Sequence, residues 1–198
     1  GQSDLVILSM LKALSLSTFD GSPEKFNAWW VEFETNVEPI TEGRPQYRID
    51  QLKRFLAPHV REIMIAPDCK PTMEEYLSIK DSLHERYGDP SLAAQLIMDK
   101  LGKGPSIAEE NVLGLQRFGD QIHVALRSLK GLAKRQGAEF EVRSQMSNAE
   151  RLATIIRRLP QAWWRPLVNA NNTYTYTQQD IIDTEINKQG RAGSPTIQ

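Results

Sequence analysis

The chain has 198 residues, of which 40% are hydrophobic and 25% are charged, and its formal net charge is −1. This composition is typical of a soluble globular protein and excludes fibrous and low-complexity architectures. The single cysteine, Cys69, excludes an intramolecular disulfide or a cysteine-rich metal site and fits a reducing compartment. The apolar opening at residues 5–11 is too short to span a bilayer, so we expect a cytoplasmic protein without membrane contacts.

Charge is distributed unevenly along the chain. Residues 1–90 carry 10 basic and 15 acidic side chains, a net charge of −5, whereas residues 91–198 carry 14 and 10, a net charge of +4. The asymmetry indicates a domain boundary near residue 90. It also makes the second half the more favourable side for a polyanion.

Ser22 and Pro23 predict a helix start, because proline at the first helical position has no amide to leave unpaired. Apolar side chains then recur every three or four residues as far as Val37, and Pro39 marks the end. The expected core anchors of the first domain are Phe26, Trp29, Trp30 and Phe33. A tryptophan ring that lines a groove or a subunit contact is the alternative.

Further helical segments follow before residue 90. Apolar positions from Ile49 to Leu56 predict a helix that stops before Pro58, and the next few residues predict a short helical turn that ends at Pro67. Thr72 and Glu75 match a capping box, which opens a helix whose buried face is Tyr76, Ile79, Leu83 and Tyr87. Gly88 follows where a left-handed C-cap is expected.

The second half has the same kind of signals. A helix is predicted from Pro90 to Gly102. A capping box of Ser106 and Glu109 predicts the start of the longest helix, which ends near Gly137, and a second box of Ser147 and Glu150 predicts a helix broken by Pro160. Thr177 caps a last predicted helix that carries Ile181, Ile182 and Ile186. The best local match to a strand, residues 171–177, is short and leads straight into that helix.

These elements predict an all-α fold of two small helical bundles joined by a short linker. The expected boundaries are residues 1–88 for the first domain, 89–190 for the second and 191–198 for a flexible Gly/Ser/Pro tail.

No motif of an enzyme is present in the sequence. It has no Gly-rich phosphate loop, no His-Glu-x-x-His and no nucleophile elbow. Asp20, Gly21 and Ser22 contain the letters of the retroviral-type aspartic protease signature in the wrong order, and Ser22 is explained as a helix cap. We therefore expect a protein that is not an enzyme and has no cofactor, metal or small-molecule substrate.

Several short motifs recur in a distinctive order: LSLSTFDG at residues 14–21, an aromatic helix, QLKRFL at 51–56, LHERYG at 83–88 and IIRRLP at 155–160. In this order the chain resembles the Gag polyprotein of LTR retrotransposons, most closely the Pao/BEL type, over about residues 11–190. The resemblance implies a capsid protein with N- and C-terminal helical domains, which self-assembles into virus-like particles around the RNA of the element. One cysteine cannot form the zinc knuckle of a complete Gag, and no protease signature is present. The resemblance therefore implies either the capsid region of a longer precursor or a captured host gene of the same ancestry.

Residues near the start of the second domain resemble the major homology region of retroviral capsids. Gly104 and Pro105 resemble its Gly-Pro step, and Glu109, Arg117 and Phe118 its Glu and Arg-Phe elements. The sequence departs from that pattern in the spacing of the Gly-Pro step, which comes two residues too early, and at Lys103, where the family has glutamine. The capping box with Ser106 explains Glu109 without any homology.

Two groups of residues are candidates for contacts with partners. Trp163 and Trp164 follow a helix break at Pro160, so they are candidates for a subunit interface, with burial in the core as the alternative. The candidate RNA-facing residues are Lys134, Arg135, Arg157 and Arg158, among further basic residues at Arg143, Arg151 and Arg165. Simple solvated helix faces are the alternative for this second group.

The function expected from the resemblance is therefore homo-oligomeric assembly of a capsid, with RNA held by weak electrostatic contacts. Two other functions stay open. The chain is similar enough to a domesticated, Arc-like Gag descendant to be a peptide-binding or adaptor protein. An unrelated all-helical adaptor is the third interpretation.

Overall fold

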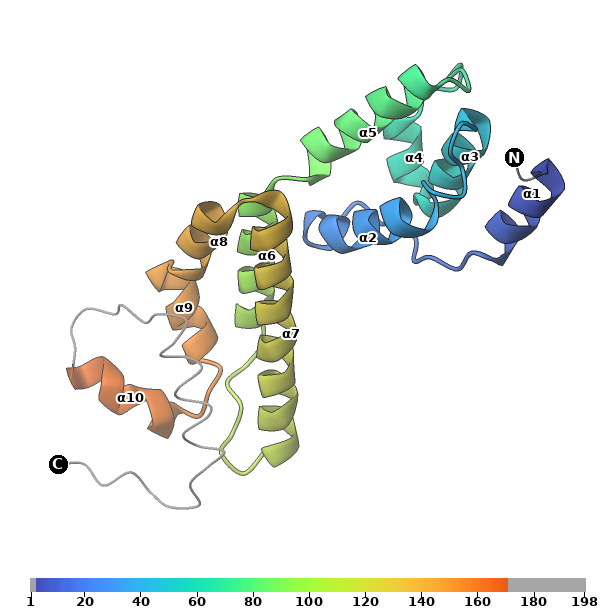
Figure 1. Cartoon of the computed structure of the whole chain (residues 1–198). Coiled ribbons are helices and arrows are strands. Elements are labelled where there is room, and N and C mark those ends of the chain that lie inside the picture. The colour runs from blue at the N-terminus through green and yellow to red at the C-terminus, as the bar shows by residue number, and fades with distance from the viewer. Residues whose placement is uncertain (1–2, 171–198) are drawn as a thin grey trace. The chain divides into compact units, whose positions relative to one another are not determined.

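The computed structural model describes residues 3–170, with side chains as far as residue 166 (Figure 1). All regular elements of this part are α-helices, and its only extended pairing is an isolated bridge between Phe19 and Leu56. The chain divides into two compact units, residues 1–89 and 90–198, one residue beyond the predicted boundary. Among the described residues, no helix is both long and apolar enough to cross a membrane.

The first unit contains five helices. They are α1 (Asp4–Ala13), α2 (Pro23–Asn36), α3 (Pro45–Phe55), α4 (Pro58–Met64) and α5 (Met73–Tyr87). Proline occupies the start of α2, α3 and α4, where its fixed φ suits a helix and its missing N–H costs nothing. Thr72 caps α5 by accepting a hydrogen bond from the amide of Glu75, which is one half of the predicted capping box. The amide of Thr72 itself donates to the carbonyl of Lys70 at 2.8 Å.

Aromatic rings make up the centre of the first unit. Phe26, Trp29, Trp30 and Phe33, the predicted core anchors, are all at most 5% exposed. Phe19, which precedes α2, contacts this group at 5.4 Å from the ring of Phe26 and 5.2 Å from that of Trp29. Such edge-to-face and offset pairs add to the free energy gained by burying the rings.

Two sets of hydrogen bonds attach the N-terminal segment to this core. The amide of Phe19 donates to the carbonyl of Phe55 at 2.8 Å, and the amide of Ala57 donates to the carbonyl of Phe19 at 2.9 Å. Nη1 of Arg54 donates to the carbonyl of Leu11 in the last turn of α1 at 2.8 Å, and Nη2 donates to the carbonyl of its C-cap, Leu14, at 3.1 Å.

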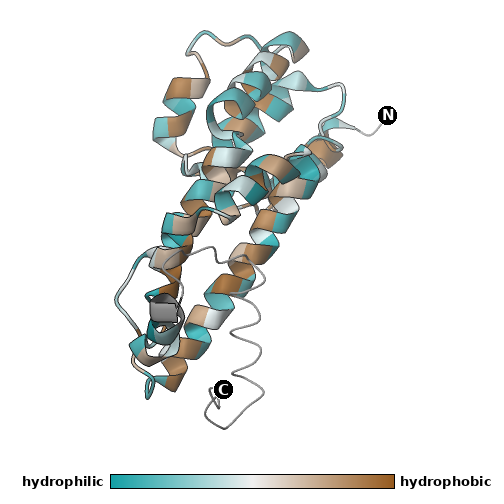
Figure 2. Cartoon of the chain, turned by 90° about the vertical axis from the view of Figure 1, so that its left-hand side faces the viewer, coloured by the Kyte–Doolittle hydropathy of each residue, from teal (hydrophilic) through white to brown (hydrophobic). Residues whose placement is uncertain are grey.

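The second unit, as far as it is described, also contains five helices. They are α6 (Pro90–Gly102), α7 (Val112–Gln136), α8 (Glu139–Met146), α9 (Ala149–Ile156) and α10 (Gln161–Ala170). Helix α6 packs against α7, α8 and α9 and so occupies the middle of this unit. Figure 2 shows apolar and hydrophilic residues alternating along the helices, as expected where each helix buries one face.

Three predicted helix boundaries are wrong in detail: the end of α5 and the starts of α7 and α9. Gly88 closes α5 with φ of −91°, outside the left-handed region, whereas Gly137, which closes α7 as predicted, has a left-handed φ of 60°. Helix α7 begins at Val112 behind an Asn111 cap, so Ser106 and Glu109 do not form a capping box at its start.

Helix α9 differs from its prediction in the same way. Its cap is Asn148, which accepts from the amide of Arg151, and the hydroxyl of Ser147 instead donates to the carbonyl of Arg143. Helices α1 and α8 were not predicted as elements. The expected strand-like residues 171–177, the helix capped by Thr177 and the tail 191–198 lie outside the described residues.

Candidate functional site

A hollow lies between α7 and α8. It has a volume of about 790 Å³. Its floor is apolar and consists of Leu126, Leu129, Ala133, Val142 and Met146. Its rim carries the cations Arg127, Lys130, Lys134 and Arg143, together with His123 and a single carboxylate, Glu139. We call this surface the α7–α8 groove.

The rim residues of α7 form a regular stripe. His123, Arg127, Lys130 and Lys134 stand at relative positions 0, 4, 7 and 11, which places them on one face of the helix, and all four are exposed. No ion pair engages the three cations among the residues that the structure describes. The groove is therefore a positively charged surface with an apolar floor.

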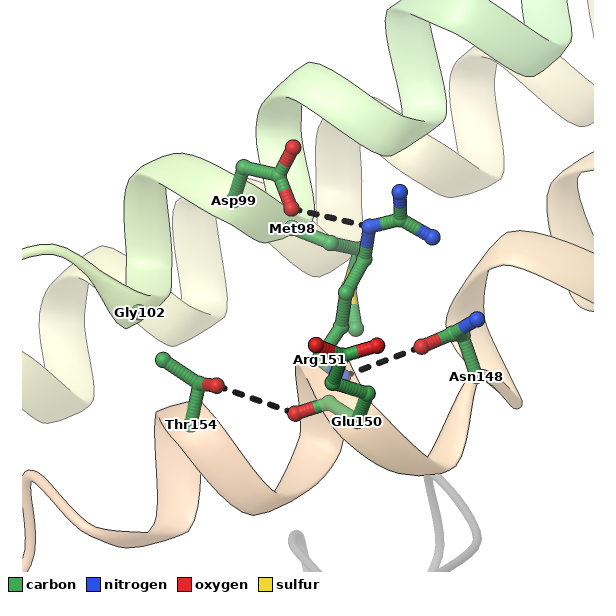
Figure 3. Close-up of a pocket in the computed structure, with 7 residues that line it drawn as sticks. All are labelled: Met98, Asp99, Gly102, Asn148, Glu150, Arg151 and Thr154. Carbon is green, nitrogen blue, oxygen red and sulfur yellow. Dashed lines mark hydrogen bonds and ion pairs between the residues drawn. The ribbon is translucent and has the colours of Figure 1, made fainter.

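A second, smaller hollow of about 220 Å³ lies between α6 and α9 (Figure 3). Arg151, one of its lining residues, bonds Asp99 within the hollow and Gln145 beside it. Nε of Arg151 donates to Oδ1 of Asp99 at 2.8 Å, and Nη1 donates to Oε1 of Gln145 at 3.0 Å. These bonds join α6 to α9 and to the end of α8, so we interpret this hollow as a structural contact.

The four candidate RNA-facing residues do not form one surface. Lys134 lines the α7–α8 groove, and Arg135 and Arg157 are exposed outside it. Arg158 instead is half-buried, with its guanidinium carbon 4.5 Å from the ring centroid of Phe118 and its Nη1 donating to the carbonyl of Leu101 at 3.1 Å. The structure thus uses Arg158 to hold helices together.

The residues that resemble the major homology region are also divided. Phe118 is 1% exposed and belongs to the core of the second unit. Glu109 lies in the turn before α7, and Glu109 and Arg117 are both exposed. Within the described residues, no ion pair connects either of them to another side chain.

Trp163 and Trp164 lie in the first turn of α10, which continues past Pro166, so the predicted broken connection is in fact helical. Both rings are half-buried and pack against the core of the second unit. The indole Nε1 of Trp164 donates to the carbonyl of Leu159 at 3.2 Å. Each ring thus has one part in the core and another part that is open to solvent.

The ionisable groups of the first unit hold helices together. The hydroxyl of Tyr76 donates to Oε1 of Glu38, which also receives a bond from Nζ of Lys80 at 3.2 Å. Burial, and then the bond to Glu38, raise the pKa of Tyr76 far above its usual range. His84 lies edge-on to Phe26 and Trp30, and burial, followed by the charge of Lys80, lowers its pKa.

Other titratable side chains give no sign of a reactive centre. Hydrogen bonds from Lys25 and Ser22 hold the pKa of the exposed Asp20 well below its usual range. Burial raises the pKa of the Cys69 thiol, which disfavours the reactive thiolate. Within residues 3–166, no group of three or more His, Cys, Asp or Glu side chains is placed to hold a metal ion.

Sequence reasoning missed most of the groove. It named Lys134 but not the three preceding members of the stripe, although their spacing is legible in the sequence. Arg143 on α8 is also among the basic residues named from the sequence. The floor residues Val142 and Met146 have no such signal, because the short apolar pattern of α8 does not predict a helix.

No protein-family model matches the chain, and comparisons with curated proteins and with solved structures find no match.

Proposed function

We propose that the chain is a Gag-type capsid protein that self-assembles into a shell around retroelement RNA. The ordered motifs of the sequence and the division into two helical units support this proposal. The observation that carries it is that both units leave large apolar side chains in solvent.

In the first unit these side chains lie on α1, where Leu5 is 80% exposed and Val6, Leu8 and Met10 are each at least 39% exposed. In the second unit Phe140 on α8 is 81% exposed, and Val112, Leu113 and Val124 on α7 are each at least 59% exposed. The exposed apolar side chains of α1 lie close together on one short helix, and such clusters are typical of surfaces that other proteins cover. Those of the second unit are spread from the start of α7 to α8. A shell needs at least two contacts per chain, and we assign one of them to α1.

RNA packaging requires cations that remain accessible after folding. Lys134, Arg135 and Arg157 are exposed and meet this condition, while Arg158 is engaged inside the fold. Contacts of this kind reach phosphates without reading bases, and their affinity falls steeply as salt is added.

The test of self-assembly is electron microscopy of the purified protein at high concentration and high salt, alongside analytical ultracentrifugation. Spherical or tubular particles are the expected result. A chain that sediments as a monomer at every concentration and salt level contradicts the proposal.

One observation favours a second candidate, a domesticated Gag descendant that acts as a peptide-binding adaptor. The α7–α8 groove has the apolar floor and charged rim that suit an amphipathic helix. Pull-downs with amphipathic peptides test this candidate, and a chain that captures none of them contradicts it.

A further inference from the structure

The first unit presents an acidic stripe on the outer face of α5. Glu74, Ser78, Asp81 and Glu85 stand at relative positions 0, 4, 7 and 11, and all four are exposed. The cations of α5 are engaged elsewhere, since Lys80 pairs with Glu38 at 3.2 Å and the guanidinium of Arg86 lies 5.7 Å from the ring centroid of Tyr87. No ion pair engages the three carboxylates among the described residues.

The acidic stripe of α5 matches the basic stripe of α7 in spacing. His123, Arg127, Lys130 and Lys134 occupy the same relative positions 0, 4, 7 and 11. Each stripe therefore spans about 16 Å along its helix at a rise of about 1.5 Å per residue. The pattern 0, 4, 7, 11 is unchanged when it is reversed, so the positions correspond whether the two helices run parallel or antiparallel. In either direction two carboxylates of α5 stand opposite two cations of α7.

The apolar parts of the two surfaces also correspond. Leu77 on α5 is 49% exposed and flanks the acidic stripe. The α7–α8 groove offers half-buried Leu126 and Ala133 beside its basic stripe. Apolar contact in the middle with charges at the rim is the usual anatomy of a protein interface.

We propose that the acidic stripe of α5 in one copy of the chain docks into the α7–α8 groove of a second copy. The two surfaces differ, so the contact is head-to-tail and propagates into a ring or a filament. This inference rests on the proposed self-assembly and specifies one of its contacts. RNA is the less suitable occupant, because phosphates would use the rim and leave the apolar floor without a partner.

Charge exchange in the full-length chain tests this contact. The groove variant combines Arg127→Glu, Lys130→Glu and Lys134→Glu, and the stripe variant combines Glu74→Lys, Asp81→Lys and Glu85→Lys. Reversing every charge of one stripe makes the test independent of helix direction. We expect each variant to weaken self-association at least about tenfold in sedimentation equilibrium without RNA at low salt. A chain that carries both sets should recover to within about threefold of the parent.

Matched controls change the same number of charges elsewhere. They are Lys100→Glu, Lys103→Glu and Arg157→Glu for the groove, and Glu42→Lys, Glu62→Lys and Asp68→Lys for the stripe, all at exposed positions. Circular dichroism of each variant establishes that its helices are retained. The controls should associate like the parent.

Zero-length carbodiimide crosslinking supplies an independent readout on the unmodified chain. Mixed 14N- and 15N-labelled protein should give crosslinked peptides that join Lys130 or Lys134 to α5 carboxylates across the two isotopes. Crosslinks confined to one isotope show a contact within the chain and overturn the inference.

The remaining outcomes separate the inference from the proposed function. A parent chain that never associates overturns both. A parent that associates, while the combined variant stays as weak as either set alone, overturns only the α5 contact. If the groove variant loses RNA binding but associates normally, the groove is an RNA site and the inference is wrong.

Discussion

The guanidinium of Arg158 lies over the ring of Phe118, with its central carbon 4.5 Å from the ring centroid. The peptide group of the same residue also holds the segment before α7, because its carbonyl accepts a hydrogen bond from the amide of Ile107 at 2.7 Å. Nη1 reaches the carbonyl of Leu101 at the end of α6. One residue thus connects the end of α9 to α6, to α7 and to the loop between them.

Replacing Arg158 should therefore destabilise the second unit. Arg158→Ala removes the cation–π contact and leaves the carbonyl of Leu101 without its side-chain donor, so we expect a loss of about 1–3 kcal/mol in the free energy of unfolding. Arg157→Ala, at the exposed neighbouring position, should change it by less than about 0.5 kcal/mol. Urea denaturation of both variants measures the difference, and equal effects would contradict the structural role of Arg158.

Gly104 is required for the same arrangement. Its φ of 121° is rarely adopted by other residues, and a Cβ there would lie 3.0 Å from Nη2 of Arg158. Gly104→Ala should lower the free energy of unfolding by about 1–3 kcal/mol. Gly131→Ala is the matched control, because Gly131 is helical and a Cβ there meets nothing within 4 Å. That control should raise stability by about 0.5–1 kcal/mol, and thermal melts of the two variants should move in opposite directions.

His84 should make the first unit sensitive to mild acid. Its pKa is lowered in the folded chain, chiefly by burial, so the unfolded chain takes up the proton first as the pH falls below about 6.5. Stability is therefore complete above that pH and is lost as the pH falls through the lowered pKa. His84→Gln removes this titration, and its denaturation midpoint should vary less between pH 7.5 and 5.5 than that of the parent.

The low pKa of Asp20 and one control variant help to assign that pH effect to His84. The carboxylate of Asp20 has a pKa well below its usual range, so it titrates only in more acidic solution. His123→Gln, at an exposed position on α7, provides the control for loss of a histidine. If the parent and His84→Gln have the same pH dependence of stability, the assignment to His84 is wrong.

The α10 tryptophans should contribute to association between chains. Their half-buried rings leave part of each indole open to a partner, so Trp163→Ala and Trp164→Ala should each weaken self-association by several-fold or more. Trp164→Ala should also reduce stability, because it removes the bond to the carbonyl of Leu159. Sedimentation velocity measures association, and variants that remain folded and associate like the parent would show that the rings serve the core alone.

The sequence predicts the buried faces of the helices better than their ends. Apolar spacing identifies the core anchors of α2 because burial of a stripe depends on the helical period alone. The start of α7 depends on tertiary contacts instead. Ser106 has the spacing of a cap, yet its hydroxyl donates to the carbonyl of Leu159, 53 residues later in the chain, and Asn111 caps the helix. Local pattern cannot choose between two polar residues when a distant segment engages one of them.

The same limit applies to the basic residues of the second half. Arg157 and Arg158 are adjacent in sequence, but one is exposed and the other is packed on Phe118, because neighbouring residues of a helical turn point about 100° apart. Adjacent basic residues in the sequence therefore do not define a basic surface in the fold. The groove was hidden for a different reason, since its second wall is α8, whose short apolar pattern carries no start signal.

The bridge formed by Phe19 has a consequence for how the first unit opens. Its two backbone hydrogen bonds to Phe55 and Ala57, together with a ring that is 1% exposed, attach this residue to the junction of α3 and α4 independently of α1. Helix α1 can therefore detach while Ser17, whose carbonyl accepts a hydrogen bond from Nε1 of Trp29, and Phe19 stay attached to the aromatic cluster. In native-state hydrogen exchange, the amides of α1 should form a separate, faster-exchanging group, and the amide of Phe19 should exchange with the core.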